Sequence, residues 1–244
     1  MVKQCESILW FIEKYGVESH RIISVLIPEI NEMVGFNQNN PYHHLDVWNH
    51  TVTAISNVSN DNIIRLVMLL HDIGKPRSYT EDERGGHFYG HPKVSADMAK
   101  DILERLECDS DTASMVIELV LQHDVEINPS KKSVRRWLNR LGKDQFERLL
   151  EVKIADAKAQ SPEFNKAKLA KIQRVYGKLS EVIEEESVFK LKDLAVNGKD
   201  LIDIGIPQGK ELGFTLNHLM NMVVNGEIEN DKEDLLKIVG KKFS

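Results

Sequence analysis

The sequence has few cysteines, few aromatic residues and no long hydrophobic run. Among its 244 residues there are two cysteines, and aromatic side chains make up 7%. Cys5 and Cys108 lie in unrelated sequence contexts and form neither a CxxC site nor a disulfide framework, which favours a reducing compartment. The densest apolar run, 63–70, is interrupted by Arg65 and is too short to cross a bilayer. No signal peptide is recognisable, so we expect a cytoplasmic protein with no membrane partner.

The remaining composition is that of an ordinary globular protein. Hydrophobic residues make up 41% and charged residues 29%, which is more apolar than a disordered chain. The length suits one large domain, or a medium domain with a small one. The formal net charge of −6 does not favour long-range attraction to nucleic acid.

Helical periodicity dominates the chain, and we find neither an alternating strand series nor a hairpin signal. Residues 62–70 are apolar nearly all round, which predicts a buried helix. Residues 77–90 read as a polar loop. Asp111 is expected to cap the helix that runs from there to Asp124. The composition of the chain changes near residue 187, after which glycines become frequent. A helix is expected to resume from about Thr215. Other helical patterns cover 6–15, 20–34, 47–58, 92–107, 131–140, 144–159 and 165–186.

A group of histidines and aspartates indicates a metal site. A single His-Asp pair is usually structural, but here further imidazoles and a carboxylate recur at helix ends or among small residues. A charged aspartate among apolar neighbours is costly unless it is paired or bound to metal. Imidazole and carboxylate together suit Mg, Mn, Fe, Co, Ni or Zn. The candidate ligands for one or two such ions are His50, His71, Asp72, His91, His123 and Asp156.

The order His…His-Asp…His…His…Asp resembles the HD superfamily of metal-dependent phosphohydrolases. The resemblance implies a first ion held by His50, His71, Asp72 and Asp156. It implies a second ion held by His91 and His123, with Asp72 bridging the two. In His71-Asp72-Ile73-Gly74-Lys75, Lys75 matches a basic residue often placed near the substrate phosphate.

Motifs on both sides of this region are similar to bacterial tRNA nucleotidyltransferases, the CCA-adding enzymes and poly(A) polymerases. The similarity implies an all-α protein with an N-terminal helical segment (1–40), an HD bundle (41–186) and a helical tail (187–244). The Gly-Ser motif with paired aspartates that marks their nucleotidyltransferase head does not occur here, so we expect no nucleotide addition by this chain alone. The matching motifs are Gly35-Phe36-Asn37-Gln38, Tyr42-His43-His44, Asp46-Val47-Trp48-Asn49-His50-Thr51, Val134-Arg135-Arg136-Trp137-Leu138 and Gly198-Lys199-Asp200-Leu201.

The expected function is hydrolysis of nucleotide-like phosphate esters, including 2′,3′-cyclic nucleotides or RNA ends, by a phosphodiesterase or phosphatase. Asp72, Lys75 and Asp124 are the expected catalytic residues. Lys75 would stabilise phosphate charge, and Asp124 would orient His123 or accept a proton. We expect His87, in the loop before His91, to bind substrate together with Lys75, whereas the preceding His43 and His44 read as structural loop residues.

A basic cluster on residues 131–143 keeps a second interpretation open. As a solvated helix face it needs no function, but it could also contact an RNA backbone through Arg135 and Arg136. The alternative function is therefore a non-catalytic tRNA- or RNA-binding module that works with a separate nucleotidyltransferase chain. RNA affinity would then depend on salt and on Arg135 and Arg136, and not on Asp72.

Overall fold

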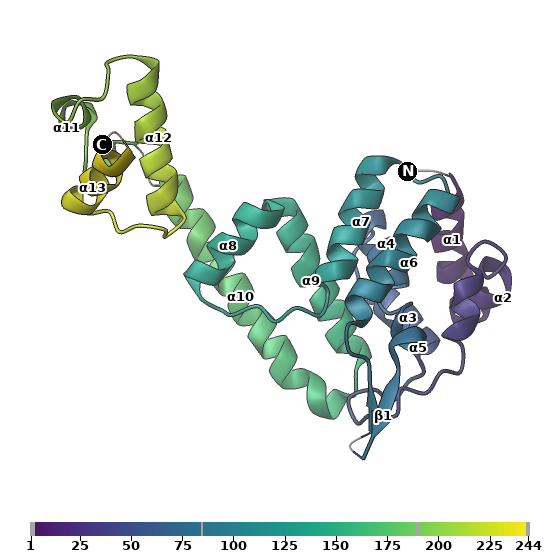
Figure 1. Cartoon of the computed structure of the whole chain (residues 1–244). Helices are drawn as coiled ribbons and strands as arrows, with labels where there is room; N and C mark the ends of the chain where they lie inside the picture. The colour runs from purple at the N-terminus through teal and green to yellow at the C-terminus, as the bar shows by residue number, and fades with distance from the viewer. Residues whose placement is uncertain (1–2, 84, 189–190, 243–244) are drawn as a thin grey trace. The chain divides into compact units, whose positions relative to one another are not determined.

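A computed structural model describes residues 3–83, 85–188 and 191–242. Helices make up nearly all of its regular structure, and the all-α expectation is confirmed (Figure 1). The chain forms two compact units, the first from Met1–Glu126 and Lys143–Gln173, the second from Ile127–Gly142 and Arg174–Ser244. No helix within the described residues is both long enough and apolar enough to cross a membrane.

The first unit holds most of the helices and the only sheet of the described residues. The sheet is an antiparallel hairpin in which Thr80 pairs with His87. The elements are α1 (Lys3–Tyr15), η1 (Gly16–Ser19), α2 (His20–Ile23), η2 (Pro28–Glu32), α3 (Val47–Ile55), α4 (Asn62–Leu70), α5 (Lys75–Ser78), β1 (Thr80–Asp82), β2 (Gly85–His87), α6 (His91–Arg105), α7 (Ser110–Gln122), α9 (Lys143–Ala159) and the first part of α10 (Pro162–Val188).

Helix α4 is the buried helix that the apolar run predicts. Its N-terminus is capped by Asp61, whose side chain accepts hydrogen bonds from the backbone of Ile63 and Ile64. It packs against α3, α7 and α9, with α1 also in contact. Because apolar neighbours surround it, the His71-Asp72 pair at its C-terminal end lies in the interior and not at the surface.

The turn after this pair is held close to α6 at Gly74. A Cβ added to Gly74 would lie 2.6 Å from the backbone nitrogen of Ser95, so a larger residue would push α6 away. The backbone N–H of Gly74 also donates to Ser95 Oγ at 3.0 Å. Since α6 begins at His91, this approach fixes His91 relative to Asp72.

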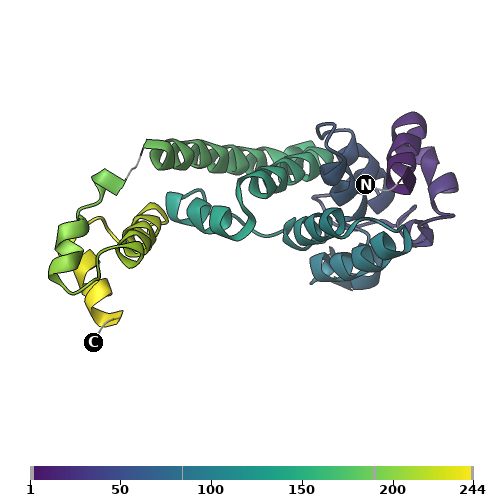
Figure 2. The same ribbon diagram turned by 90° about the horizontal axis from the view of Figure 1, so that it is seen from above.

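The second unit has its own apolar core, built mainly by the C-terminal helices coloured green to yellow in Figure 2. Asn197 caps α11 in a capping box with Asp200. The unit contains α8 (Lys131–Leu141), the remainder of α10, η3 (Leu191–Asp193), α11 (Gly198–Asp203), α12 (Lys210–Val224) and α13 (Lys232–Lys242). The core residues are Leu194, Val196, Leu201, Ile206, Leu219, Leu235 and Val239.

Several local expectations are wrong. The hairpin lies in the predicted loop 77–90, because strands of three residues are too short to give an alternating pattern. Asp109, and not Asp111, caps α7, since its side chain accepts from the backbone N–H of Thr112 at 2.9 Å. Helix α12 begins at Lys210, five residues before the expected start. The predicted functional domain limits at residues 40 and 186 stay predictions.

The two cysteines are also closer than their sequence contexts indicate. Cys5 in α1 is fully buried and hydrogen-bonded to Cys108, which follows α6. Burial raises the pKa of the Cys5 thiol to about 12, and the neighbouring Cys108 raises it further. Both are free thiols in this structure, and their sequence contexts gave no sign of this contact.

Candidate metal centre

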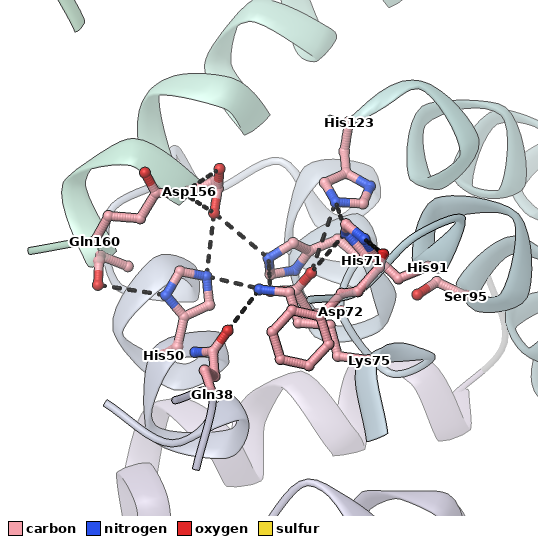
Figure 3. A network of polar contacts seen from close by, with 12 residues as sticks. Gln38, His50, His71, Asp72, Lys75, His91, Ser95, His123, Asp156 and Gln160 are labelled. Carbon is pink, nitrogen blue, oxygen red and sulfur yellow. Dashed lines mark hydrogen bonds and ion pairs between the residues drawn. The ribbon is translucent and has the colours of Figure 1, made fainter. Parts of the chain in front are cut away.

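Six buried side chains converge in the interior of the first unit (Figure 3). His50 comes from α3, His71 and Asp72 from the end of α4, and His91 from the start of α6. His123 and Asp156 complete the group. His123 follows the last residue of α7, and Asp156 lies within α9. These are the six residues that the sequence analysis singled out, and their role as ligands stays a prediction.

Each histidine is oriented by a backbone carbonyl. A carbonyl oxygen only accepts, so the ring nitrogen facing it carries the proton. The other nitrogen, Nε2, is then free to act as a ligand and faces the centre in all four rings. The Nδ1 atoms donate to Ala159 O from His50 (3.3 Å), to Met68 O from His71 (2.7 Å), to Phe88 O from His91 (2.9 Å) and to Val120 O from His123 (2.7 Å).

The carboxylate of Asp72 lies between two sets of ligand atoms. Its Oδ2 is 3.4 Å from His50 Nε2 and 3.1 Å from His71 Nε2. Its Oδ1 is 3.4 Å from His91 Nε2 and 3.6 Å from His123 Nε2. Asp156 Oδ1 joins the first set, 3.1 Å from His50 Nε2. Within each set the ligand atoms lie no more than 4.8 Å apart.

Unsatisfied atoms indicate that a cation fits here. His71 Nε2 is buried without a hydrogen-bond partner, which is costly in an interior, and Asp72 Oδ2 has no donor other than the Lys75 ammonium. In the second set, the Nε2 atoms of His91 and His123 lie 3.1 Å apart. Their Nδ1 atoms hold the ring protons, so two lone pairs face each other. One divalent cation in each set would satisfy these atoms, and the nitrogen and oxygen donors suit the ions named above.

Two lysines balance the two buried carboxylates. Lys75 Nζ lies 2.8 Å from Asp72 Oδ2, and Lys168 Nζ lies 2.7 Å from Asp156 Oδ2. Burial would raise the pKa of Asp72, but His71 and Lys75 hold that pKa well below its usual range. Burial would likewise raise the pKa of Asp156, but Lys168 and His50 hold it well below its usual range. Both carboxylates are therefore ionised and can bind a cation.

The surroundings of His71 favour its protonated form, whereas a metal ligand has to be neutral. Burial lowers the pKa of His71, but Asp72 and then Asp156 outweigh burial and raise it above the ordinary value. Without a cation, the carboxylates favour a proton on this ring. A metal ion bound here would have to displace that proton, so its affinity would fall as the pH is lowered.

A cavity of about 580 Å³ opens onto the centre. Lys75, His87 and Asp124 line it, together with the candidate ligands Asp72 and His91, so these predicted residues share one pocket. Lys75 is buried, and its Nζ also donates to Gln38 Oε1 at 2.7 Å.

The structure gives the contacts of three other predicted residues, whose substrate and catalytic roles stay predictions. The Val120 carbonyl, and not Asp124, orients His123, because it accepts the Nδ1 proton; the proton-acceptor role of Asp124 stays a prediction. Arg135 and Arg136 lie on α8 in the second unit. Arg135 pairs with Glu185 at 2.7 Å, whereas Arg136 is exposed.

Sequence reasoning missed several residues that contact the centre. His43 lines the pocket, with its ring 5.1 Å from that of His50, and was expected to be structural. Burial, and then the Lys75 charge, lower the pKa of His43 to about 3, so its ring is neutral. Gln160 donates to both oxygens of Asp156. Gln160 directly follows the last residue of α9, four residues after Asp156, and that spacing is a signal that could have identified it.

Lys153, three residues before Asp156 in α9, holds the end of α7 in place. Its Nζ donates to the carbonyls of His123 (2.7 Å) and Val125 (2.6 Å). Burial, and then Lys168, lower the pKa of Lys153 to about 8. Between pH 8 and the ordinary value of 10.5 the unfolded chain binds more protons than the folded protein. The free energy of unfolding therefore gains a contribution from Lys153 as the pH rises through this window.

Replacing Lys153 with methionine should remove that contribution. We would measure the free energy of unfolding by urea denaturation between pH 7.5 and 10.5. For Lys153→Met this free energy should rise less steeply with pH than for the wild type, by at most about 1.4 kcal/mol per pH unit. Lys158→Met, an exposed position on the same helix, is the control and should follow the wild-type slope. Equal slopes for Lys153→Met and the wild type would show that Lys153 does not titrate in this way.

Comparison with known proteins gives the family. The A-adding tRNA nucleotidyltransferase of Deinococcus radiodurans is 29% identical over 230 residues, which cover 89% of this chain and 51% of that protein. The CC-adding tRNA nucleotidyltransferase of Thermus thermophilus is 26% identical over 219 residues, 87% of this chain and 48% of that protein. A Multifunctional CCA protein of Azoarcus sp. is 28% identical over 41% of this chain.

The chain thus spans about half the length of the first two relatives. The wider HD resemblance rests on the six candidate ligands and stays a prediction. A family model described as tRNA nucleotidyltransferase domain 2, putative, matches residues 88–239, which include His91, His123, Asp156 and most of the second unit. Because this match covers more than half of the chain, the protein belongs to that family.

Proposed function

We propose that this protein is a metal-dependent phosphohydrolase that acts on nucleotide-like phosphate esters, including 2′,3′-cyclic nucleotides or RNA ends. The observation that carries the proposal is Asp72, whose two carboxylate oxygens face two separate buried sets of imidazole and carboxylate ligands. A divalent ion bound there supplies an acidified water and neutralises phosphate charge.

The roles of the other residues follow from their contacts. His50, His71 and Asp156 would hold one ion with Asp72, and His91 and His123 would hold a second. Lys75 contributes a positive charge at the edge of the pocket, 2.8 Å from Asp72, where the charge of a phosphate would be stabilised. Asp124 is exposed at the same pocket and would accept a proton.

The test is hydrolysis of adenosine 2′,3′-cyclic phosphate and of a bis-aryl phosphodiester in the presence of Mg, Mn, Ni or Co. We expect turnover that depends on the metal and stops when EDTA is added. Bound metal without turnover of any phosphodiester or phosphomonoester would contradict the proposal.

A second candidate function is a non-catalytic RNA-binding module. It is supported by the tRNA-adding relatives and by α8, which exposes Lys132, Arg136 and Arg140. This function predicts RNA affinity that falls with salt and with loss of Arg136, and that survives loss of Asp72. A protein that binds RNA in this way but neither binds metal nor hydrolyses any ester would favour it.

A further inference from the structure

The pocket above the metal centre has an aromatic wall as well as a polar floor. The floor carries Asp72, His91 and His123, and the wall is the segment His87-Phe88-Tyr89 that leads from β2 into α6. Wall and floor are covalently continuous, because His91 follows Tyr89 by two residues. Two residues span at most about 7 Å of chain, so the wall and a candidate ligand lie within reach of one small molecule.

Two rings of the wall are stacked on each other. His87 and Tyr89 have centroids 5.2 Å apart and planes inclined by 12°. His87 is itself held by a hydrogen bond between its Nε2 and Asp82 Oδ1, at 2.9 Å across the hairpin. Tyr89 remains 77% exposed, although the stacking covers one face of its ring. A large, exposed and oriented aromatic side chain contributes little to a core, and it offers a surface on which a flat group can stack.

The backbone holds this stacked pair in position over the pocket. The N–H of Gly86 donates to the carbonyl of Asn39 at 2.7 Å, which attaches β2 to the segment before α3. A Cβ on Gly86 would lie 2.4 Å from the carbonyl oxygen of Gln38, so this close contact requires glycine. Phe88, between the two stacked residues, packs on Tyr79 with ring centroids 5.5 Å apart. The wall is therefore ordered before any ligand arrives, which reduces the entropy lost on binding.

We propose that His87 and Tyr89 form a base-stacking platform, and that the ligand of this pocket is a nucleoside phosphate. The base lies on Tyr89, while the phosphate lies over Asp72 and Lys75. Stacking on an aromatic ring is tolerant of base identity because every base has a π-face. The platform therefore selects nucleosides over simple phosphate esters without strong preference among the four bases. The inference relies on the proposed function for the fate of the phosphate, but not for the binding of the base.

The first experiment compares two substrates that differ in the base. Adenosine 2′,3′-cyclic phosphate carries a base, and glycerol 1,2-cyclic phosphate carries the same reacting group without one. Tyr89→Ala should lower kcat/KM about tenfold for the adenosine compound, the typical effect of one stacked base, and leave the glycerol compound unchanged. Tyr89→Phe should restore the wild-type value. Tyr15→Ala, an exposed tyrosine on α1, is the matched control and should change neither.

A binding measurement separates failure of the platform from failure of the proposed function. By calorimetry, Tyr89→Ala should weaken binding of adenosine 3′-monophosphate about tenfold and leave glycerol 2-phosphate unaffected. That result without hydrolysis by any variant would refute the phosphohydrolase and retain the platform. Equal effects of Tyr89→Ala on the compounds with and without a base, or no effect on either, would overturn the platform.

A third substrate identifies the source of the nucleoside. A short RNA ending in a 2′,3′-cyclic phosphate presents the same base and phosphate as the free nucleotide. If the RNA has the higher kcat/KM and the same tenfold dependence on Tyr89, the platform receives an RNA end. If the mononucleotide is preferred, the platform receives a free nucleotide.

Discussion

Replacing Asp72 with alanine should abolish metal binding and hydrolysis together. Of the six candidate ligands, Asp72 alone has oxygens that face both sets, so its loss removes a candidate ligand from each. We expect purified Asp72→Ala to hold no stoichiometric Mn or Ni by elemental analysis. Its kcat/KM for adenosine 2′,3′-cyclic phosphate should fall at least about a hundredfold.

This variant also leaves Lys75 buried beside an empty volume, and an unpaired buried charge can cost about 3–5 kcal/mol. Asp72→Asn preserves the shape of the side chain, and circular dichroism on both variants separates a lost ligand from a lost fold. Asp111→Asn, at an exposed position in the first turn of α7, is the control and should keep both metal and activity. Folded Asp72 variants that retain wild-type metal content and turnover would refute the proposed centre.

Replacing His123 with alanine should remove one ion and leave the other. His123 belongs to the set that faces Asp72 Oδ1, whereas His50, His71 and Asp156 face Oδ2 or each other. The wild type should therefore hold two ions per chain and His123→Ala one. We expect hydrolysis to fall at least about a hundredfold, because the phosphate loses one of two cationic partners.

The stoichiometry is measured by elemental analysis after equilibration with Mn and desalting. His218→Ala is the control, since this exposed histidine lies on α12 in the second unit. A single ion in the wild type would show that the two-ion prediction is wrong. Loss of both ions from His123→Ala would show that the two sets do not bind independently.

The sequence predicts the convergence of the six candidate ligands because helix ends are visible in it. The apolar run of α4 stops at His71, and Pro92 marks the start of α6 next to His91. The candidate ligands at these helix ends point into the interior of the first unit. This is why the order of these residues along the chain was informative.

The contacts that complete the centre could not be predicted in the same way. Lys168 reaches Asp156 from α10, and this pairing depends on how two helices pack and not on any local pattern. The stacked pair His87 and Tyr89 depends on a hairpin of two three-residue strands, too short for a periodic signal. The contact between Cys5 and Cys108 likewise follows from the packing of α1 near the end of α6.

The two lysine–carboxylate pairs bring the four charges at the candidate centre close to neutrality. Asp72 and Asp156 are matched by Lys75 and Lys168, so a divalent ion bound there would add its full positive charge to the pocket. The whole chain carries a formal charge of −6. With metal bound, a phosphate ester would be repelled at long range and attracted at short range. At physiological ionic strength, where screening acts over about 8 Å, salt weakens the outer repulsion more than the inner attraction, so moderate salt should speed substrate capture.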